Sequence, residues 1–178
     1  MNTAGAPMYQ FAQIIDFPFL GDEFLQMLAA HFAAVHPGKA LDMDELRKGF
    51  EKIGCKPALM RDVVRAMSAE GLTDVERGIG NYMASGHQLA IWRALLNSVD
   101  AFDQAVLTVV AKGKPPLSQA TLRELASIPG ARPTISKVRS SLEKLKRIGL
   151  LSKSAAGTTV DDPLFAEFLR LRADRGWM

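Results

Sequence analysis

Apolar residues recur at every third or fourth position along most of the chain, and this spacing is typical of amphipathic helices. In the first half, the pattern predicts an extended opening segment over residues 11–20 and then a series of helices. Pro37-Gly38 is a clear breaker between the first two of them. Asp42 and Glu45 have the spacing of a capping box, which predicts a helix start at this point. The predicted helices cover residues 22–35, 42–53, 57–70, 73–84 and 87–96.

The second half predicts three further helices, a pair of short strands and a last helix. The first helix covers residues 100–111 and is ended by the breaker run 113–116. Ser118 is expected to cap the second helix, and Pro133 is expected at the first position of the third, which Gly149 ends. The side chains of the third helix predicted to be buried form one stripe, made of Ile135, Val138, Leu142 and Leu145.

Two short apolar or β-branched runs follow the third helix. Leu150-Leu151 and Thr158-Thr159-Val160 flank a small polar loop, and this pattern predicts a β-hairpin. The order helix, helix, turn, helix, hairpin is that of the winged helix-turn-helix fold. The sequence therefore predicts a mainly α protein: a helical bundle over residues 1–99, then a winged helix-turn-helix domain over residues 100–178 with a small β-hairpin wing and a C-terminal helix.

Length and composition set limits on the function. The chain has 178 residues, of which 48% are hydrophobic and 23% charged, and these are the proportions of a soluble globular protein. It has no room for a large catalytic domain. No stretch approaches the roughly 18 apolar residues of a membrane span, and the N-terminus lacks the features of a signal peptide. We therefore expect no membrane association and a cytoplasmic location. The lone Cys55 is expected to be a small buried residue.

Charge is distributed unevenly between the two halves. Residues 1–99 carry nine Lys and Arg against eleven Asp and Glu, a net charge of −2, whereas residues 100–178 carry thirteen against eight, a net charge of +5. Within segment 113–153 the excess reaches +7, from nine basic and two acidic side chains. A basic region of this size indicates a polyanionic partner, although a solvated lysine-rich helix face has the same composition.

Double-stranded DNA is the partner that best fits a basic winged helix. Near the start of the third helix, Ser136, Lys137 and Ser140 could reach base edges in the major groove. Arg132, Arg139, Lys144 and Lys153 would contact phosphates, so binding is expected to weaken steeply with salt. Docking onto a protein surface is the alternative use of the same face. The predicted DNA-binding residues are Arg132, Thr134, Ser136, Lys137, Arg139, Ser140, Lys144, Arg147 and Lys153.

Two segments carry a resemblance to a known family. The run Asp162-Pro163-Leu164-Phe165 resembles the ending of archaeal-type AAA+ and STAND-like ATPases, in which D-P-L-F leads into a short helix. Three runs in the first half resemble the helical lid of that family: Phe17-Pro18-Phe19-Leu20, Asp22-Glu23-Phe24 and Ile53-Gly54-Cys55-Lys56-Pro57. The last run stands where the family usually has the motif T-G-G-x-P. The resemblance implies either the C-terminal lid and winged-helix region of such an ATPase or a relative that has lost its core. It also makes a nucleotide-binding core a possible partner.

Residues for catalysis are not found. A P-loop needs Ser or Thr after its Gly-Lys pair, but Gly38-Lys39 precedes Ala40 and Gly113-Lys114 precedes Pro115. His31, His36 and His87 do not have the spacing of a zinc site or of a catalytic triad. We therefore expect neither an enzyme nor a bound cofactor or metal ion.

Three functions remain open at this stage. The first is a DNA-binding module of an ATPase-like protein, and the second is a regulatory module that docks on an ATPase core or another protein. An exposed apolar patch on the N-terminal bundle would favour the second. The third is a stand-alone winged-helix transcription regulator with an effector pocket lined by Phe50, Tyr82 and Trp92, although core packing is the favoured role of these three side chains. The oligomeric state, the DNA site and any effector stay undetermined.

Overall fold

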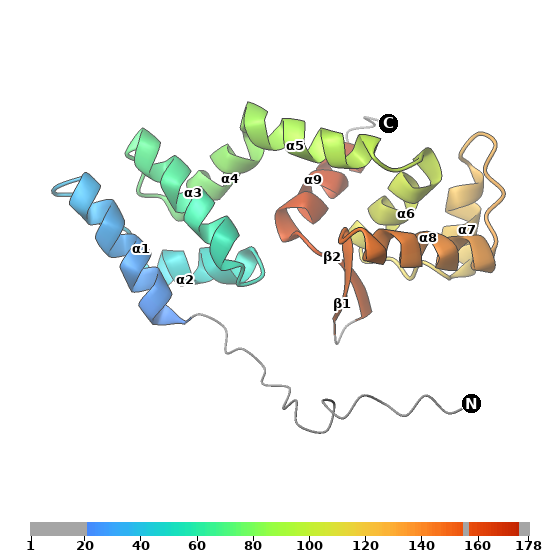
Figure 1. Cartoon of the computed structure of the whole chain (residues 1–178), viewed down its shortest axis with the longest axis horizontal. Helices are drawn as coiled ribbons and strands as arrows, with labels where there is room; N and C mark the ends of the chain where they lie inside the picture. Colours follow the sequence, from blue (N-terminus) through green and yellow to red (C-terminus); the bar gives the residue numbers. More distant parts are fainter. Residues whose placement is uncertain (1–20, 155–156, 175–178) are drawn as a thin grey trace, which may run out of the picture.

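The computed structural model describes residues 21–154 and 157–174 (Figure 1). The predicted extended segment at 11–20 lies outside these ranges, and so does the run Phe17-Pro18-Phe19-Leu20. The described part is mainly helical and contains a two-stranded antiparallel sheet. None of its helices is long and apolar enough to cross a lipid bilayer.

Four helices form an N-terminal cluster, in which α1 packs on α2 and α3, and α4 packs on the same two helices. Their bounds are α1 Asp22–Val35, α2 Met43–Lys52, α3 Pro57–Glu70 and α4 Val75–Ala84. Their amphipathic faces meet in a core that includes Phe32, Leu46 and Met60. Helices α3 and α4 approach closely because Gly78 has no side chain, and a Cβ atom there would overlap Met67. This cluster accounts for the 3.6-residue apolar period of the first half.

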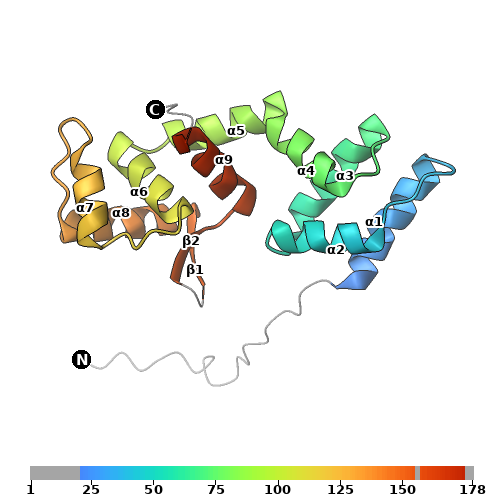
Figure 2. The ribbon, with the colours of Figure 1, turned by 180° about the vertical axis from the view of Figure 1, so that it is seen from behind.

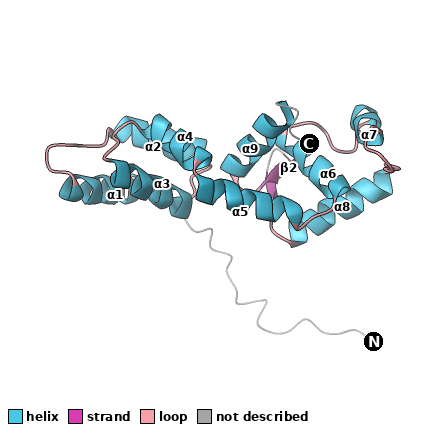
Figure 3. Cartoon of the chain, turned by 90° about the horizontal axis from the view of Figure 1, so that it is seen from above, coloured by secondary structure: helices cyan, strands magenta, loops and turns pink. Residues whose placement is uncertain are grey.

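Helix α5 (Gly86–Asn97) joins the N-terminal cluster to the rest of the chain (Figure 3). Ser85 caps it, because the Ser85 hydroxyl accepts a hydrogen bond from the Gln88 backbone N–H. The helix buries Trp92, which is 1% exposed and packs against the rings of Phe165 and Phe168. Helix α5 is therefore fixed by an aromatic contact as well as by its chain connections.

The remaining elements form a C-terminal cluster around α6, which contacts α7, α8, α9 and β2. Their bounds are α6 Ala101–Ala111, α7 Gln119–Ala126, α8 Ile135–Arg147, β1 Leu151–Ser154, β2 Gly157–Val160 and α9 Pro163–Asp174. The strands pair antiparallel, with Leu151 opposite Val160. Figure 2 shows the resulting ribbon projecting below the helices of this cluster, with α7 at the cluster's outer end. Val106 and Leu107 of α6 are fully buried, as expected for the central helix.

Three local predictions need correction. Pro133 lies outside α8, since the helix begins at Ile135 and Thr134 is its N-cap. Ile135 is 43% exposed because it lies at the first helical position, and Ser141 joins the buried side of the helix. The capping box at α2 is only half formed: Asp42 caps the helix, but the Glu45 carboxylate accepts from the Val75 backbone N–H, at 3.5 Å, and so ties α2 to α4.

The two segments that resemble ATPase motifs lie in contact. Gly54, in the turn between α2 and α3, has a φ of +70°, and a Cβ atom there would come within 2.9 Å of Pro163 at the start of α9. Beside this contact, Lys56 Nζ lies 2.6 Å from a carboxylate oxygen of Asp161. The N-terminal and C-terminal clusters are therefore joined at a second place besides α5.

Candidate nucleic-acid interface

Helix α8 is positioned by its apolar side and by its cap. Val138, Leu142 and Leu145 are buried against the C-terminal cluster. At the start of the helix, the Thr134 hydroxyl accepts a hydrogen bond from the Lys137 backbone N–H over 3.1 Å. Thr134, predicted as a DNA-binding residue, therefore uses its side chain to cap the helix. Such a cap satisfies one of the free N–H groups at the helix start.

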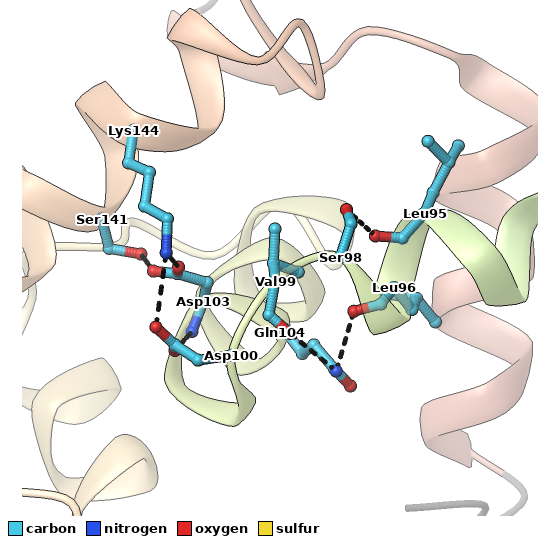
Figure 4. A network of polar contacts seen from close by, with 9 residues as sticks. All are labelled: Leu95, Leu96, Ser98, Val99, Asp100, Asp103, Gln104, Ser141 and Lys144. Atoms are coloured by element: carbon cyan, nitrogen blue, oxygen red, sulfur yellow. Dashed lines mark hydrogen bonds and ion pairs between the residues drawn. The ribbon is translucent and has the colours of Figure 1, made fainter.

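A polar network fixes α8 to the start of α6 (Figure 4). The Asp103 carboxylate, in a residue only 3% exposed, accepts a hydrogen bond from the Ser141 hydroxyl and pairs with Lys144 Nζ, both at 2.5 Å. Lys144 Nζ also lies 3.4 Å from Asp100. The pKa of Lys144 is raised, mainly because its ammonium group donates a hydrogen bond to Asp103. The pKa of Asp100 is lowered, mainly because its carboxylate accepts a hydrogen bond from the Asp103 backbone N–H.

The same polar region fixes the chain between α5 and α6. The Gln104 side-chain amide donates to the backbone carbonyls of Leu96 and Val99, at 2.9 and 3.2 Å. These carbonyls belong to the end of α5 and to the connection that follows it, where helical partners are lacking. The start of α6 is therefore held both by α8 and by the end of α5, as Figure 4 shows.

Lys137 also faces α6. Its Nζ lies 4.4 Å from the centre of the Phe102 ring, which is a cation–π contact. The sequence predicted Lys137 and Lys144 among the outward-facing positions, but the structure turns both ammonium groups toward α6. The cause is the start of α6, which presents an aromatic ring and two carboxylates on the side that α8 covers.

The opposite side of α8 forms the outward face, defined by Ser136, Ser140, Glu143 and Arg147. All four are exposed, and they follow one another at helical spacing. Arg139 is exposed beside them. Glu143 contributes the carboxylate of this face, and it pairs with Lys146 at 3.0 Å. Of the predicted site residues on α8, the structure thus gathers Ser136, Arg139, Ser140 and Arg147 on one side.

Further exposed cations lie on the segments that precede and follow α8. Arg132 lies just before α8, and Lys153 lies on β1. In the described ranges, no ion pair or hydrogen bond engages the side chains of Arg132, Arg139, Arg147 or Lys153. Arg123 on α7 is exposed in the same way, but the sequence prediction did not include it. The only sequence feature that could have indicated Arg123 is its place within the basic segment 113–153.

The described residues contain no group of three or more His, Cys, Asp or Glu side chains arranged to hold a metal ion. Cys55 is half-buried and has a φ of 52° in the turn beside Gly54. It is therefore less buried than the sequence predicted, and its backbone has a left-handed conformation.

Comparison with known proteins identifies a relationship at the level of the fold. No family model matches the chain, and no curated protein sequence matches it. Among solved structures, the Walker-type ATPase PABY2304 of Pyrococcus abyssi is similar, with a TM-score of 0.61 and 17% sequence identity. The similarity covers 86% of this chain and 42% of the ATPase chain, so this chain spans less than half of that protein's length. The chain therefore has a mainly helical fold that is similar to part of that protein's structure.

Proposed function

We propose that this chain is a non-catalytic module of an ATPase-like protein and that it binds double-stranded DNA through a winged helix. In this proposal residues 1–99 form a lid-like bundle. Residues 100–178 form the winged helix-turn-helix, in which α8 is the recognition helix and the β1–β2 ribbon is the wing. The observation that carries the proposal is the distribution of charge on α8: Lys137 and Lys144 are engaged by α6, whereas Arg139 and Arg147 are exposed and have no carboxylate partner in the described part of the chain.

The two kinds of cation would have different tasks. The engaged lysines hold α8 at a fixed angle on α6, so that the outward face can meet a groove as a rigid surface. Arg132, Arg139, Arg147 and Lys153 would then neutralise phosphates on either side of that groove. Ser136 and Ser140 are the short polar side chains left to reach base edges. Because most of these contacts involve phosphate, we expect modest sequence preference and strong salt dependence.

The test is fluorescence anisotropy of a labelled generic DNA duplex, titrated with the full chain over a series of salt concentrations. The variant R139A/R147A removes two cations from the interface. We expect its affinity to fall by about tenfold at low salt and its salt slope to fall by about 2, since each lost phosphate contact lowers that slope by about 0.9.

The matched control is R61A/R65A, which removes the same charge from α3, where both side chains are well exposed. It should bind as the unmodified chain does. Equal losses in the two double variants would mean that only net charge matters, and the interface on α8 would then be wrong. Absence of binding by the unmodified chain at low salt would overturn DNA binding as such.

Docking on an ATPase core is the second candidate, and one observation favours it. Helix α1 carries no Asp, Glu, Lys or Arg after Glu23, and its Met27 and Val35 are 47% and 65% exposed. An apolar helix face of this kind is typical of a surface that another protein covers. If the chain fails to bind DNA but M27K/V35K abolishes association with a nucleotide-binding core, this second function replaces the first.

A further inference from the structure

A cleft of about 880 Å³ opens between α4 and α5 on one side and α9 on the other. Phe168 is half-buried in this cleft, and its ring packs on the buried Trp92 with 5.1 Å between the ring centroids. Leu171, on the α9 side, is 41% exposed. The cleft therefore presents a broad apolar surface to solvent. Its larger apolar lining residues are Met83, Leu89, Trp92, Leu96, Phe168 and Leu171.

The hollow persists because the residues on the α4 side are small. Gly80 and Ala84 line it there, and a Cβ atom added at Gly80 would meet no heavy atom within 4 Å. This differs from Gly78 two positions earlier, where the same addition would overlap Met67. Glycine inside a helix costs about 1 kcal/mol relative to alanine. Close packing on Met67 explains why position 78 is a glycine despite this cost. At position 80 the described residues provide no such packing reason.

The charged side chains that line the cleft are both cations. Arg93 lies on α5 and Arg172 on α9, and Asn97 adds an amide near the end of α5. No carboxylate is found among the lining residues. Arg93 is exposed and forms no ion pair with any residue of 21–154 or 157–174. A ligand that complements this lining combines an apolar body with a negative charge.

We propose that this cleft binds a small organic anion with a flat apolar body, of the class of aromatic carboxylates. The volume lies within the range of roughly 300 to 1,000 Å³ that is typical of small-molecule sites. The half-buried ring of Phe168 offers a surface on which a planar ring can stack, and the buried ring of Trp92 supports it from behind. The guanidinium of Arg93 offers a paired donor geometry suited to a carboxylate. The site does not depend on DNA binding, because it shares no residue with the outward face of α8.

The test compares three probes that share one ring system and differ in charge: naphthoate, naphthalenemethanol and naphthylmethylammonium. Affinity is measured by isothermal titration calorimetry on the full chain. Location is followed from the Trp92 indole N–H signal in the NMR spectrum of a W177F variant, which leaves Trp92 as its single tryptophan. Naphthoate should bind tightest, about fivefold tighter than the alcohol, which is the upper end for an exposed ion pair. The indole signal should shift on its addition.

Two variants test the two halves of the ligand. R93A should reduce naphthoate binding to the level of the alcohol, whereas R61A on α3 should leave it unchanged. G80F places a ring in the open space beside Gly80 and should weaken all three probes by at least about tenfold. G80A is its matched control: it adds a methyl group where there is room, so it should keep probe binding and should raise the melting temperature.

Several results would overturn the proposal. Equal affinity for the three probes, or preference for the ammonium probe, would show that the cleft does not select a negative charge. No shift of the Trp92 indole at millimolar naphthoate, in a chain with an unchanged circular dichroism spectrum, would remove the site. Full binding by G80F would place the probe elsewhere. Preference for an acidic amphipathic helical peptide over naphthoate, lost in G80F, would assign the cleft to a protein helix instead.

Discussion

The carboxylate of Asp103 in α6 lies 2.5 Å from the ammonium group of Lys144 in α8, and the two partners differ greatly in exposure. The Asp103 side chain is 5% exposed, whereas that of Lys144 is 49% exposed. The buried partner depends on the exposed one, because a carboxylate removed from water needs a counter-charge and hydrogen bonds. Ser141 supplies the hydrogen bond and Lys144 supplies the charge. This pair sets the position of α8 on α6.

Replacing Lys144 by methionine should destabilise the chain. The aliphatic stem keeps its packing, but the Asp103 carboxylate loses its counter-charge while it stays buried. We expect a clearly lower melting temperature for K144M than for R147M, which removes an exposed and unpaired charge from the same helix. Circular dichroism melting curves provide the measurement. In D103N/K144M no buried charge is left, so part of the lost stability should return, and a double variant no better than K144M would contradict this account.

Ser141 should contribute through its hydrogen bond to the same carboxylate. Ser141 is 4% exposed, and the change S141A removes a hydrogen bond to a charged group without adding bulk. The expected loss is about 1.5 to 3 kcal/mol in the free energy of unfolding. Urea denaturation of S141A, with S140A on the exposed side of the helix as control, measures this loss. Similar midpoints for the two variants would show that the hydroxyl of Ser141 has no special role.

Stability should fall in acid in a manner that depends on Asp100. The Asp103 backbone N–H and, to a lesser extent, Lys144 lower the pKa of Asp100 in the folded chain. A carboxyl group with a lowered folded-state pKa contributes stability above its unfolded value of about 3.9, and this contribution is lost as the pH falls through the folded value. The melting temperature of D100N should therefore be lower near neutral pH and should depend less on pH below about 4.

The control for this effect is E51Q, which removes an exposed carboxylate of α2. The Glu51 side chain forms no ion pair with the residues of 21–154 or 157–174, so the melting temperature of E51Q near neutral pH should equal that of the unmodified chain. Parallel curves for D100N and the unmodified chain would exclude Asp100 as a source of the pH dependence.

DNA affinity should rise when the carboxylate of the outward face is removed. Glu143 lies between Ser140 and Arg147 on this face and pairs with Lys146 at 3.0 Å. The change E143Q removes its repulsion of phosphate and releases Lys146. We expect two- to fivefold tighter binding at low salt, about 0.4 to 1 kcal/mol, measured by anisotropy. The control E51Q carries the same charge change on α2, and an equal gain there would indicate a non-specific charge effect.

Gly54 should tolerate alanine less well than Gly38 does. Both have positive φ, +70° and +83°, so each change to alanine has a backbone cost of about 1 to 2 kcal/mol. Only at Gly54 does the added Cβ approach another side chain, with Pro163 at 2.9 Å. We expect G54A to lose more free energy of unfolding than G38A by about 1 kcal/mol or more. Chemical denaturation of the two variants gives this difference directly, and equal losses would show that the Pro163 contact yields easily.

The apolar period was sufficient to predict most of the helices, because each buries one face against its neighbours. The strand pair was also predictable, since Leu150-Leu151 and Thr158-Thr159-Val160 flank a polar loop. The starts of helices were less predictable. Pro133 fits a first helical turn by itself, but Thr134 forms the cap and moves the start to Ile135. Local preference placed this boundary within two residues and did not determine which residue is the cap.

The candidate interface was predictable as a basic region and not in its geometry. Which lysines face outward depends on α6, where Asp103 lies on the buried side among apolar residues. Asp103 interrupts the apolar pattern of that face, but the pattern does not identify its partner Lys144, which lies 41 residues away in the sequence. The cleft was beyond sequence reasoning for the same reason, since α4, α5 and α9 contribute its walls. Trp92 was considered for a pocket, but Phe50 is buried in the core and Tyr82 does not line the cleft.

The contact between Gly54 and Pro163 changes how the two clusters can move. Two bodies connected by one helix retain rotations about that helix, and such rotations occur on microsecond to millisecond timescales. The second attachment, where Lys56 also pairs with Asp161, restrains the rotations that would separate the two segments in contact. A rotation that separates the turn after α2 from the start of α9 would have to open this contact. The turn after α2 is thereby held beside the start of α9, although more than a hundred residues separate them in the sequence.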